Sequence, residues 1–368
     1  MSLRVLITGG GTGGHLYPGI AVARELLARR GDAHVTFVGT AAGIESRVIP
    51  RERFELDVIR SAGLKGKSLP ALARGVGLVP VSALDAWRVL SRRRPNVVIG
   101  VGGYSSGPVV LLAALRGIPT LLMEQNAAPG LTNRLLARVV DAAAVTYPES
   151  LAHFAGRAFV SGNPVRAEFF EQEGEHGQHD RTERRDFSSG GARVLVFGGS
   201  QGAHAINVAM VEAAPRLAAA TPRLAITHQT GERDLEMVRD GYRNAGLEAR
   251  VEPFLYAMDR EMKSADLVVA RAGATTVAEL MAAGRPSILV PLPTATDDHQ
   301  RRNAEAMVTR GAARMLEQRN VTGDALAAAI TSMAADVEGR RRMGEAARAL
   351  ARPDAARAIV EKVIAIAR

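Results

Sequence analysis

Short glycine-rich segments are the parts of this chain whose residue types are best suited to binding chemistry. Four of them occur, at residues 9–14 (GGGTGG), 100–107 (GVGGYSSG), 197–203 (FGGSQGA) and 271–276 (RAGATT). Glycine lets a phosphate or a sugar approach the backbone, and the N–H groups at the start of a following helix attract anions. One such segment is weak evidence, but four together predict a nucleotide-like or sugar-phosphate ligand.

His15 directly follows the first glycine segment. Imidazole titrates near neutral pH, so His15 is a candidate general base for removing a proton from a hydroxyl group. The alternative is a purely structural role. Glu124 and Asn126 end another apolar run, and Asn126 can orient a hydroxyl although it cannot act as a base. Weaker candidates for the base are His204, His228 and His299.

Several other chemistries lack the residues they require. A dinucleotide site needs an acid at the tip of the second strand, and here the first acid is Glu45, beyond residues 39–42. The chain has no D-x-D, no H-E-x-x-H and no cysteine, and we expect neither a bound metal nor another cofactor. His176 and His179 lie in a polar segment that we interpret as a solvated insertion. The net charge of +9 favours an anionic partner, but 4% aromatic residues argue against single-stranded nucleic acid.

The elements that must position these residues follow an alternating pattern. Apolar, β-branched runs at residues 4–8, 34–38, 96–100, 119–123 and 142–146 alternate with helical stretches, and the pattern restarts at 193–197, 224–228, 266–270 and 287–291. Such alternation is typical of parallel sheets covered on both faces. The 368 residues therefore predict an α/β fold with two doubly wound, Rossmann-like domains that face a cleft. We see neither a membrane-spanning run nor a signal peptide, and expect the chain to stay in the cytosol.

Several longer motifs occur in a characteristic order. They are GGGTGGHLYPGIAVA, GVGGYSSGP, EQNAAPGLTNRLLA, GNPVR, FGGSQGAHAIN and ARAGATTVAELMAAGRPSILVPLPTATDDHQRRNA. Together they closely resemble the MurG family of bacterial glycosyltransferases, from about residue 3 to the C-terminus, and the resemblance lapses only in the polar segment 171–191. It implies the GT-B architecture and a metal-independent, inverting transfer of N-acetylglucosamine from UDP-N-acetylglucosamine to undecaprenyl-pyrophosphoryl-N-acetylmuramoyl-pentapeptide.

The same resemblance implies that the two domains bind different substrates. Residues 1–166 are expected to face the acceptor and the membrane, and a C-terminal helix at 352–368, after the break at Pro353, to join them. Residues 167–351 are expected to bind the UDP-sugar donor. The donor contacts carried over by motif are Thr12, Gly13, Gly14, Asn126, Arg166, Ser200, Leu255, Ala274, Thr275, Thr276, Glu279 and Gln300. His299 stands where the family often has a second glutamine.

Two of these contacts have a simpler interpretation. Thr276 and Glu279 form T-x-x-E, which is the pattern of a capping box at a helix start. A carboxylate can equally accept hydrogen bonds from both hydroxyls of a ribose, and the resemblance favours that role. Ser200 is either the cap of the helix that follows it or a ligand of the diphosphate.

A possible membrane contact lies in residues 69–94. Residues 69–90 are apolar, contain Trp87 and end with Arg92, Arg93 and Arg94. An apolar face with a basic rim binds anionic lipid, although a core-facing helix with a solvated basic end fits as well. The lipid-linked acceptor favours a peripheral protein on the cytoplasmic face of the bacterial plasma membrane. The competing functions are a UDP-N-acetylglucosamine 2-epimerase and a nucleotide-sugar-binding protein without turnover.

Overall fold

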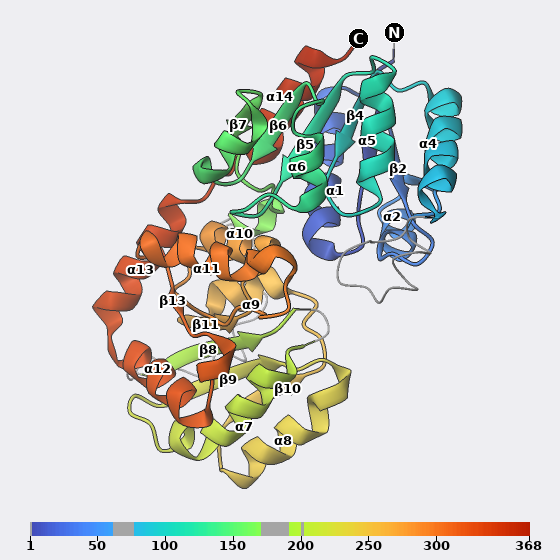
Figure 1. The fold of residues 1–368 in the computed structure, drawn as a ribbon. Coiled ribbons are helices and arrows are strands. Elements are labelled where there is room, and N and C mark those ends of the chain that lie inside the picture. The colour runs from blue at the N-terminus through green and yellow to red at the C-terminus, as the bar shows by residue number, and fades with distance from the viewer. Residues whose placement is uncertain (1, 62–76, 171–190, 200–201) are drawn as a thin grey trace. The chain divides into compact units, whose positions relative to one another are not determined.

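The computed structural model describes residues 2–61, 77–170, 191–199 and 202–368, which form two compact units (Figure 1). Unit 1 comprises Met1–Val165 together with Arg352–Arg368, and unit 2 comprises Arg166–Ala351. The chain therefore leaves unit 1 once, completes unit 2 and returns to unit 1 with its last helix.

Unit 1 is built on a parallel sheet. Its strands are β1 (Arg4–Thr8), β2 (His34–Gly39), β3 (Glu55–Val58), β4 (Val97–Gly100), β5 (Thr120–Glu124), β6 (Ala142–Val145) and β7 (Ala158–Val160). They lie side by side in the order β3-β2-β1-β4-β5-β6-β7, and every pair is parallel. The direction in which the chain adds strands reverses between β1 and β4. In open α/β sheets, ligands bind outside the carboxyl ends of the strands at this reversal.

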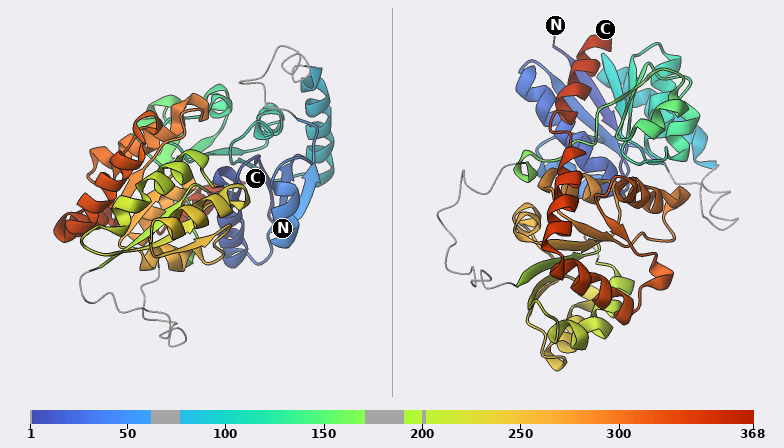
Figure 2. Two further views of the ribbon diagram at one scale, coloured as in Figure 1. Left: turned by 90° about the horizontal axis from the view of Figure 1, so that it is seen from below. Right: turned by 90° about the vertical axis from the view of Figure 1, so that its left-hand side faces the viewer.

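Helices cover both faces of this sheet. They are α1 (Gly13–Arg29), α2 (Glu45–Arg51), α4 (Val79–Arg93), α5 (Ser106–Leu115), α6 (Leu131–Leu136), η1 (Pro148–Phe154) and α14 (Ala355–Ile366). Alternate residues of β1 serve the two faces: Val5 and Ile7 are buried in one apolar cluster and Leu6 in the other. The C-terminal helix α14 packs beside α1 and contributes Ile359, with its neighbours, to the first cluster (Figures 1 and 2).

Unit 2 repeats this plan. Its strands are β8 (Ala192–Phe197), β9 (Leu224–Gln229), β10 (Ala249–Glu252), β11 (Leu267–Ala270), β12 (Ser287–Leu289) and β13 (Arg314–Met315). They are parallel and lie in the order β10-β9-β8-β11-β12-β13, so the reversal falls between β8 and β11. The prediction of two doubly wound α/β domains is confirmed.

The helices of unit 2 complete its layers. They are η2 (Ala167–Phe169), α7 (His204–Ala218), η3 (Glu232–Asp234), α8 (Leu235–Asn244), α9 (Met258–Ser264), α10 (Ala274–Ala283), η4 (Thr296–Asp298), α11 (His299–Thr309), η5 (Gln318–Asn320), α12 (Gly323–Ala335) and α13 (Val337–Ala349). The main apolar cluster joins α7 and α12 to β8, β9 and β11. Two helix starts are capped by side chains, since Thr322 accepts a hydrogen bond from Ala325 N–H and Asp336 accepts one from Gly339 N–H.

Candidate functional site

All four glycine segments lie at the strand reversals of the two sheets. In unit 1, residues 9–14 follow β1 and residues 101–105 follow β4. These two loops pack backbone against backbone, because Gly10 N–H donates to Gly102 O at 3.3 Å. A Cβ atom on Gly103 would lie 2.5 Å from Gly10 O, so any larger residue at position 103 would separate the loops. Glycine is therefore required there for packing, independently of any ligand.

A carboxylate of the protein itself occupies the first glycine loop. Glu45 Oε2 accepts a hydrogen bond from Gly11 N–H at 2.9 Å, and Oε1 accepts from Thr40 N–H at 2.8 Å and from Thr40 Oγ1 at 3.0 Å. The Glu45 side chain is buried, and a Cβ on Gly10, Gly39 or Gly43 would collide with its carboxylate. Sequence reasoning noted Glu45 only as an acid too late for a dinucleotide site. In the structure this carboxylate uses Gly11 N–H, a donor that a phosphate bound to the loop would otherwise use.

His15 is held in a defined tautomer at the carboxyl edge of the unit 1 sheet. Its Nδ1 lies 3.1 Å from Gln125 Oε1, and Gln125 Nε2 donates to Val101 O at 3.1 Å. Since Val101 O can only accept, Gln125 presents its oxygen to the imidazole, and His15 Nδ1 carries the proton. The lone pair of the neutral ring is then on Nε2. Gln125, which the sequence analysis did not single out, fixes the orientation of this ring.

Glu124 and Asn126 lie at the carboxyl end of β5 and share one network. Glu124 is buried and accepts hydrogen bonds from Asn126 N–H and Nδ2, Gly130 N–H and Asn133 Nδ2, at 2.8–3.2 Å. Its carboxylate thus shapes the loop between β5 and α6. The Glu124 side chain is therefore turned to its own loop. Thr12, Gly13 and Gly14 lie at the start of α1, where Thr12 is the N-cap residue and its side chain is exposed.

The corresponding edge of unit 2 is organised by the start of α10. The N-cap residue is Gly273, and Ala274, Thr275 and Thr276 form the first turn immediately after β11. Thr276 is thus already inside the helix and caps nothing, so the capping-box interpretation of Thr276 and Glu279 is wrong. The helix starts earlier than T-x-x-E suggests because Gly273 supplies the extended residue before the first turn. The positive end of the α10 dipole lies at the carboxyl edge of the sheet.

Glu279 lies on α10 in a position unusual for an acid. Within the described part of the chain its carboxylate makes no hydrogen bond and no ion pair. Burial raises the pKa of Glu279 from 4.5 to about 7; the positive charge of Arg166 opposes this rise, and the negative charge of Asp259 adds to it. Arg166 itself lies over the ring of Phe169, with its Cζ 5.1 Å from the ring centroid. The structure therefore places Arg166 and Glu279, two predicted ligand contacts, close to each other.

A buried glutamine joins the third glycine segment to Leu255. Gln229 Nε2 donates to Gly199 O at 2.9 Å, and Gln229 Oε1 accepts from Leu255 N–H at 2.8 Å. The N–H of Leu255 is thus already used, and its carbonyl is the backbone group left for a ligand. In Gln300 the side-chain oxygen is used, since Oε1 accepts from Leu292 N–H at 3.0 Å. Its Nε2 amino group is left to donate to a ligand. The sequence analysis missed the role of Gln229 in holding these two segments together, because its partners lie more than 25 residues away in the sequence.

A buried cation lies beside the start of α10. The guanidinium of Arg271 donates to Val290 O at 3.0 Å, to Pro291 O at 3.2 Å and to Gln318 Oε1 at 2.7 Å. No carboxylate among the described residues pairs with it, and burial lowers its pKa. A buried charge without a counter-ion is costly, so this one favours an anionic ligand nearby.

The predicted basic rim of the membrane contact is largely neutralised. Arg92 contacts Asp57 at 2.8 Å, and Arg93 contacts both Asp57 and Glu55. Burial would raise the pKa of the Asp57 carboxyl, but these arginines hold it below its ordinary value. Trp87 is 52% exposed, with Arg116 Cζ 4.5 Å from its ring centroid. Large apolar side chains are also exposed on the neighbouring helices α5 and α6 and, at Val139, just after α6. We call these residues the α4–α6 face: Trp87, Leu111, Leu115, Leu131, Leu135 and Val139.

Parts of the prediction lie outside the described residues. They are Ser200, residues 69–76 of the apolar segment, and residues 171–190 of the polar insertion with His176 and His179. Where the chain is described, it brings together no group of three or more His, Cys, Asp or Glu side chains that could hold a metal ion. None of its described helices is long and apolar enough to span a membrane.

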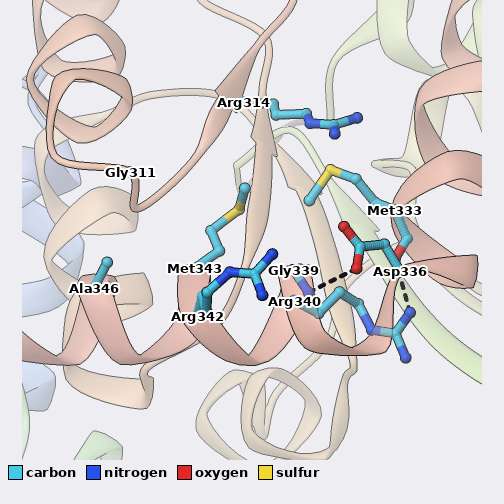
Figure 3. A pocket seen from close by; sticks show the side chains of 9 residues that line it. All are labelled: Gly311, Arg314, Met333, Asp336, Gly339, Arg340, Arg342, Met343 and Ala346. Atoms are coloured by element: carbon cyan, nitrogen blue, oxygen red, sulfur yellow. Dashed lines mark hydrogen bonds between the residues drawn. The ribbon is translucent and has the colours of Figure 1, made fainter.

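A cavity of about 470 Å³ lies elsewhere in unit 2 (Figure 3). Its walls come from α12, α13 and the turn before β13, and include Arg314, Met333, Arg342 and Met343. Because Arg314 begins β13, the cavity lies at the amino edge of the sheet, opposite the glycine loops. It is not part of the candidate site.

Comparison with known proteins identifies the family. The models of the glycosyltransferase family 28 N-terminal and C-terminal domains match residues 5–145 and 193–359. A UDP-N-acetylglucosamine–N-acetylmuramyl-(pentapeptide) pyrophosphoryl-undecaprenol N-acetylglucosamine transferase from an Anaeromyxobacter species is 48% identical over 98% of this chain and 92% of its own. The chain belongs to this transferase family.

Other members agree with this assignment. The transferase of the same name from Pelobacter propionicus is 48% identical over 98% of this chain and 99% of its own. The crystal structure of Acinetobacter baumannii MurG superimposes with a TM-score of 0.79 at 30% identity and covers 99% of both chains. The family members thus share the fold of both units, and the GT-B architecture and the MurG resemblance are confirmed.

Proposed function

We propose that this chain transfers N-acetylglucosamine from UDP-N-acetylglucosamine to N-acetylmuramyl-(pentapeptide) pyrophosphoryl-undecaprenol. The observation that carries the proposal is that members with this activity in their names match nearly the whole chain, both glycine-loop units included. The product is the lipid-linked disaccharide-pentapeptide from which peptidoglycan is made.

Unit 2 supplies the donor site in this proposal. The carbonyl of Leu255 faces the uracil, Glu279 accepts from the ribose hydroxyls, and the amide of Gln300 contacts the sugar. The diphosphate is held near the α10 start, with Thr275 and Thr276, and near Arg166 and Ser200. The charges support this assignment: the helix dipole and the unpaired guanidinium of Arg271 both favour an anion at this edge.

Unit 1 supplies the acceptor side. The neutral His15, whose Nδ1 proton is held by Gln125, accepts the proton of the attacking hydroxyl at Nε2. The hydroxyl oxygen attacks the anomeric carbon as the bond to UDP breaks, which inverts the configuration and gives a β-linkage. Asn126, at the same sheet edge as His15, orients a substrate hydroxyl. Thr12, Gly13 and Gly14, at the start of α1, are the contacts that the first glycine loop makes with the UDP-sugar donor.

UDP leaves with additional negative charge, so donors aimed at its phosphates stabilise the transition state more than the ground state. We propose that the α10 dipole and the glycine loop after β8 provide this stabilisation without a metal ion. Activity should therefore survive a chelator. Complete loss of activity with EDTA, restored by a stoichiometric divalent ion, would contradict a metal-free transfer.

The acceptor carries a lipid, and we propose that the α4–α6 face rests on an anionic membrane surface at the cytoplasmic face of the bacterial plasma membrane. Leu115 and Leu135 are 74% and 72% exposed, which is unusual for leucines of a covered helix layer. The exposed Arg116 directly follows α5, the exposed Arg138 follows α6, and both supply positive charge. We expect no nucleic-acid partner.

One experiment separates the candidate functions. The protein is incubated with labelled UDP-N-acetylglucosamine and a short-chain lipid-linked muramyl-pentapeptide. Transfer of label to the lipid supports the proposal. Formation of the 2-epimer of the donor supports an epimerase, and binding without turnover supports a regulatory protein.

A further inference from the structure

A chain of hydrogen-bonded side chains runs through unit 2 from its core to the third glycine loop. Tyr242 Oη lies 2.7 Å from His228 Nδ1, and His228 Nε2 lies 3.1 Å from Asn207 Oδ1. Asn207 Nδ2 donates to Asp234 Oδ2 at 2.9 Å, and His204 Nδ1 lies 2.9 Å from the same oxygen. The four inner side chains are buried, whereas 53% of the His204 side chain is exposed. His204 is thus the only solvent-facing end of this chain.

The direction of each hydrogen bond follows from its partners. Asn207 Nδ2 faces two acceptors, Asp234 and the carbonyl of Thr230 at 2.9 Å, so the amide oxygen must face His228. His228 Nε2 therefore carries the proton, and Nδ1 accepts from the Tyr242 hydroxyl. Burial lowers the pKa of His228 to about 3, so this ring stays neutral at physiological pH. A neutral, fully buried histidine is a poor candidate for the catalytic base.

Asp234 fixes the orientation of His204. Burial alone would raise the pKa of Asp234, but the hydrogen bonds from His204 and Asn207 outweigh burial and lower it. The group is therefore a carboxylate and can only accept, so His204 Nδ1 carries a proton that it donates to Asp234. The ring nitrogen left for a ligand is Nε2, on the exposed edge of the ring.

His204 also occupies a specific place in the fold. It is the first residue of α7, directly after the glycine loop at the carboxyl end of β8. This loop is pressed against the segment that leads to Asp234, because a Cβ on Gly202 would lie 1.7 Å from Thr230 O. The buried chain and the close backbone contact together hold the imidazole at the edge of the sheet where we place UDP.

We propose that His204 is a catalytic residue that donates a hydrogen bond from Nε2 to the diphosphate of the UDP-sugar and of the departing UDP. This inference rests on the proposed function, which places UDP in unit 2. A metal-free transfer needs donors at the leaving group, and in this proposal His204 acts as the imidazolium: Nδ1–H donates to Asp234, and Nε2–H donates to the phosphate. Asp234 acts as a positioning residue through His204.

The test compares UDP with uridine, which lacks the phosphates. In His204→Asn, the shorter side chain can still donate to Asp234 through its amide but has no group at the position of Nε2. We expect UDP to bind about 10- to 100-fold more weakly, the value of one charge-assisted hydrogen bond, while uridine affinity changes less than about twofold. The kcat for transfer should fall by a similar factor. Asp234→Asn keeps an acceptor for Nδ1 and should give a smaller loss.

His34→Asn is the matched control. His34 is exposed at the amino end of β2 in unit 1, whereas the glycine loops lie at the carboxyl ends of the strands. Unchanged UDP affinity and kcat in His204→Asn would overturn the inference. The hydrogen bond from His204 to Asp234 would then have only a structural role at the start of α7. Equal losses for uridine and UDP, or a lower melting temperature in both variants, would also overturn it by showing a structural role. If the parent protein binds neither UDP nor UDP-N-acetylglucosamine, the proposed function itself fails, and this inference with it.

Discussion

Substituting glutamine for Glu279 tests the donor site most directly, because it should change stability and affinity in opposite directions. The carboxylate has no partner among the described residues, and burial raises its pKa to about 7. Glutamine keeps the shape of the side chain and removes the charge. Arg166 loses a nearby anion, but the two groups form no ion pair in the structure.

The Glu279→Gln variant should be more stable than the parent protein at high pH. The ordinary pKa of 4.5 applies to the unfolded chain, so the folded state holds the proton more tightly between pH 4.5 and about 7. Stability contributed by the protonated group is complete below pH 4.5, is lost as the pH rises to 7, and is absent above it. One pKa unit corresponds to about 1.4 kcal/mol, so ionisation costs at most about 3 kcal/mol. Because the side chain is partly exposed, we expect Glu279→Gln to recover about 1–2 kcal/mol at pH 8, or roughly 2–8 °C in melting temperature.

Donor affinity should decrease. If the carboxylate accepts from two ribose hydroxyls, its loss costs about 1.5–3 kcal/mol, which is about 10- to 100-fold in Kd for UDP-N-acetylglucosamine. The parent should also bind the donor more weakly as the pH falls below 7, since its carboxyl group must release a proton to accept both bonds. The phosphates of a UDP-sugar remain ionised in this range, so the pH dependence reports on the protein. Glu279→Gln should bind with no such dependence.

Isothermal titration calorimetry between pH 5.5 and 8 and thermal melts of the ligand-free protein measure both effects. Glu338→Gln is the control, since Glu338 is exposed on α13 and pairs only with Arg341 in the described structure. A donor analogue with 2′,3′-dideoxyribose should bind the parent poorly and lose little more in the variant. A lower melting temperature with unchanged affinity would refute the ribose role and the assignment of this edge to the donor.

The remaining predictions concern unit 1. Glu45→Gln places an amide N–H₂ group against Gly11 N–H or the Thr40 donors, so it should lower the free energy of unfolding by about 1–3 kcal/mol, as measured by urea denaturation. His15→Gln should lower kcat about 10²- to 10⁴-fold with the KM for UDP-N-acetylglucosamine within about twofold; an unchanged kcat would exclude His15 as the base. Leu115→Ser with Leu135→Ser should weaken sedimentation with anionic vesicles more than Arg92→Glu with Arg93→Glu, because both arginines are already paired with carboxylates. If the arginine double variant lost more vesicle binding than the leucine double variant, the basic rim would be the membrane contact.

The sequence predicts the strands and glycine loops well because both depend on local residue types. β-Branched runs end at glycines, and β1, β4, β8 and β11 lie where the runs at residues 4–8, 96–100, 193–197 and 266–270 predict them. The edge strands β10 and β13 were missed because their sequences, ARVE and RM, contain no run of apolar residues.

Interactions between distant residues account for the errors at the site. Asp57 on β3 neutralises Arg92 and Arg93, which lie more than 30 residues later, and no local pattern indicates this pairing. The loop between β5 and α6 folds back and surrounds the Glu124 carboxylate with donors, and the sequence of this segment does not indicate these contacts. The T-x-x-E pattern misled for a local reason, because Gly273 and Thr276 are both acceptable N-caps and only the backbone decides between them.

The two units show why a glycine motif alone does not determine anion binding. Both units carry glycine loops at the strand reversal, but in unit 1 the buried carboxylate of Glu45 already accepts a hydrogen bond from Gly11 N–H of the loop. In unit 2 the corresponding edge has a buried guanidinium, Arg271, with no carboxylate among the described residues. A phosphate brought to the first loop meets a negative charge, and one brought to the second meets a positive charge and a helix start. The difference in buried charge, which the glycines do not reveal, is therefore the physical reason to place the UDP diphosphate in unit 2.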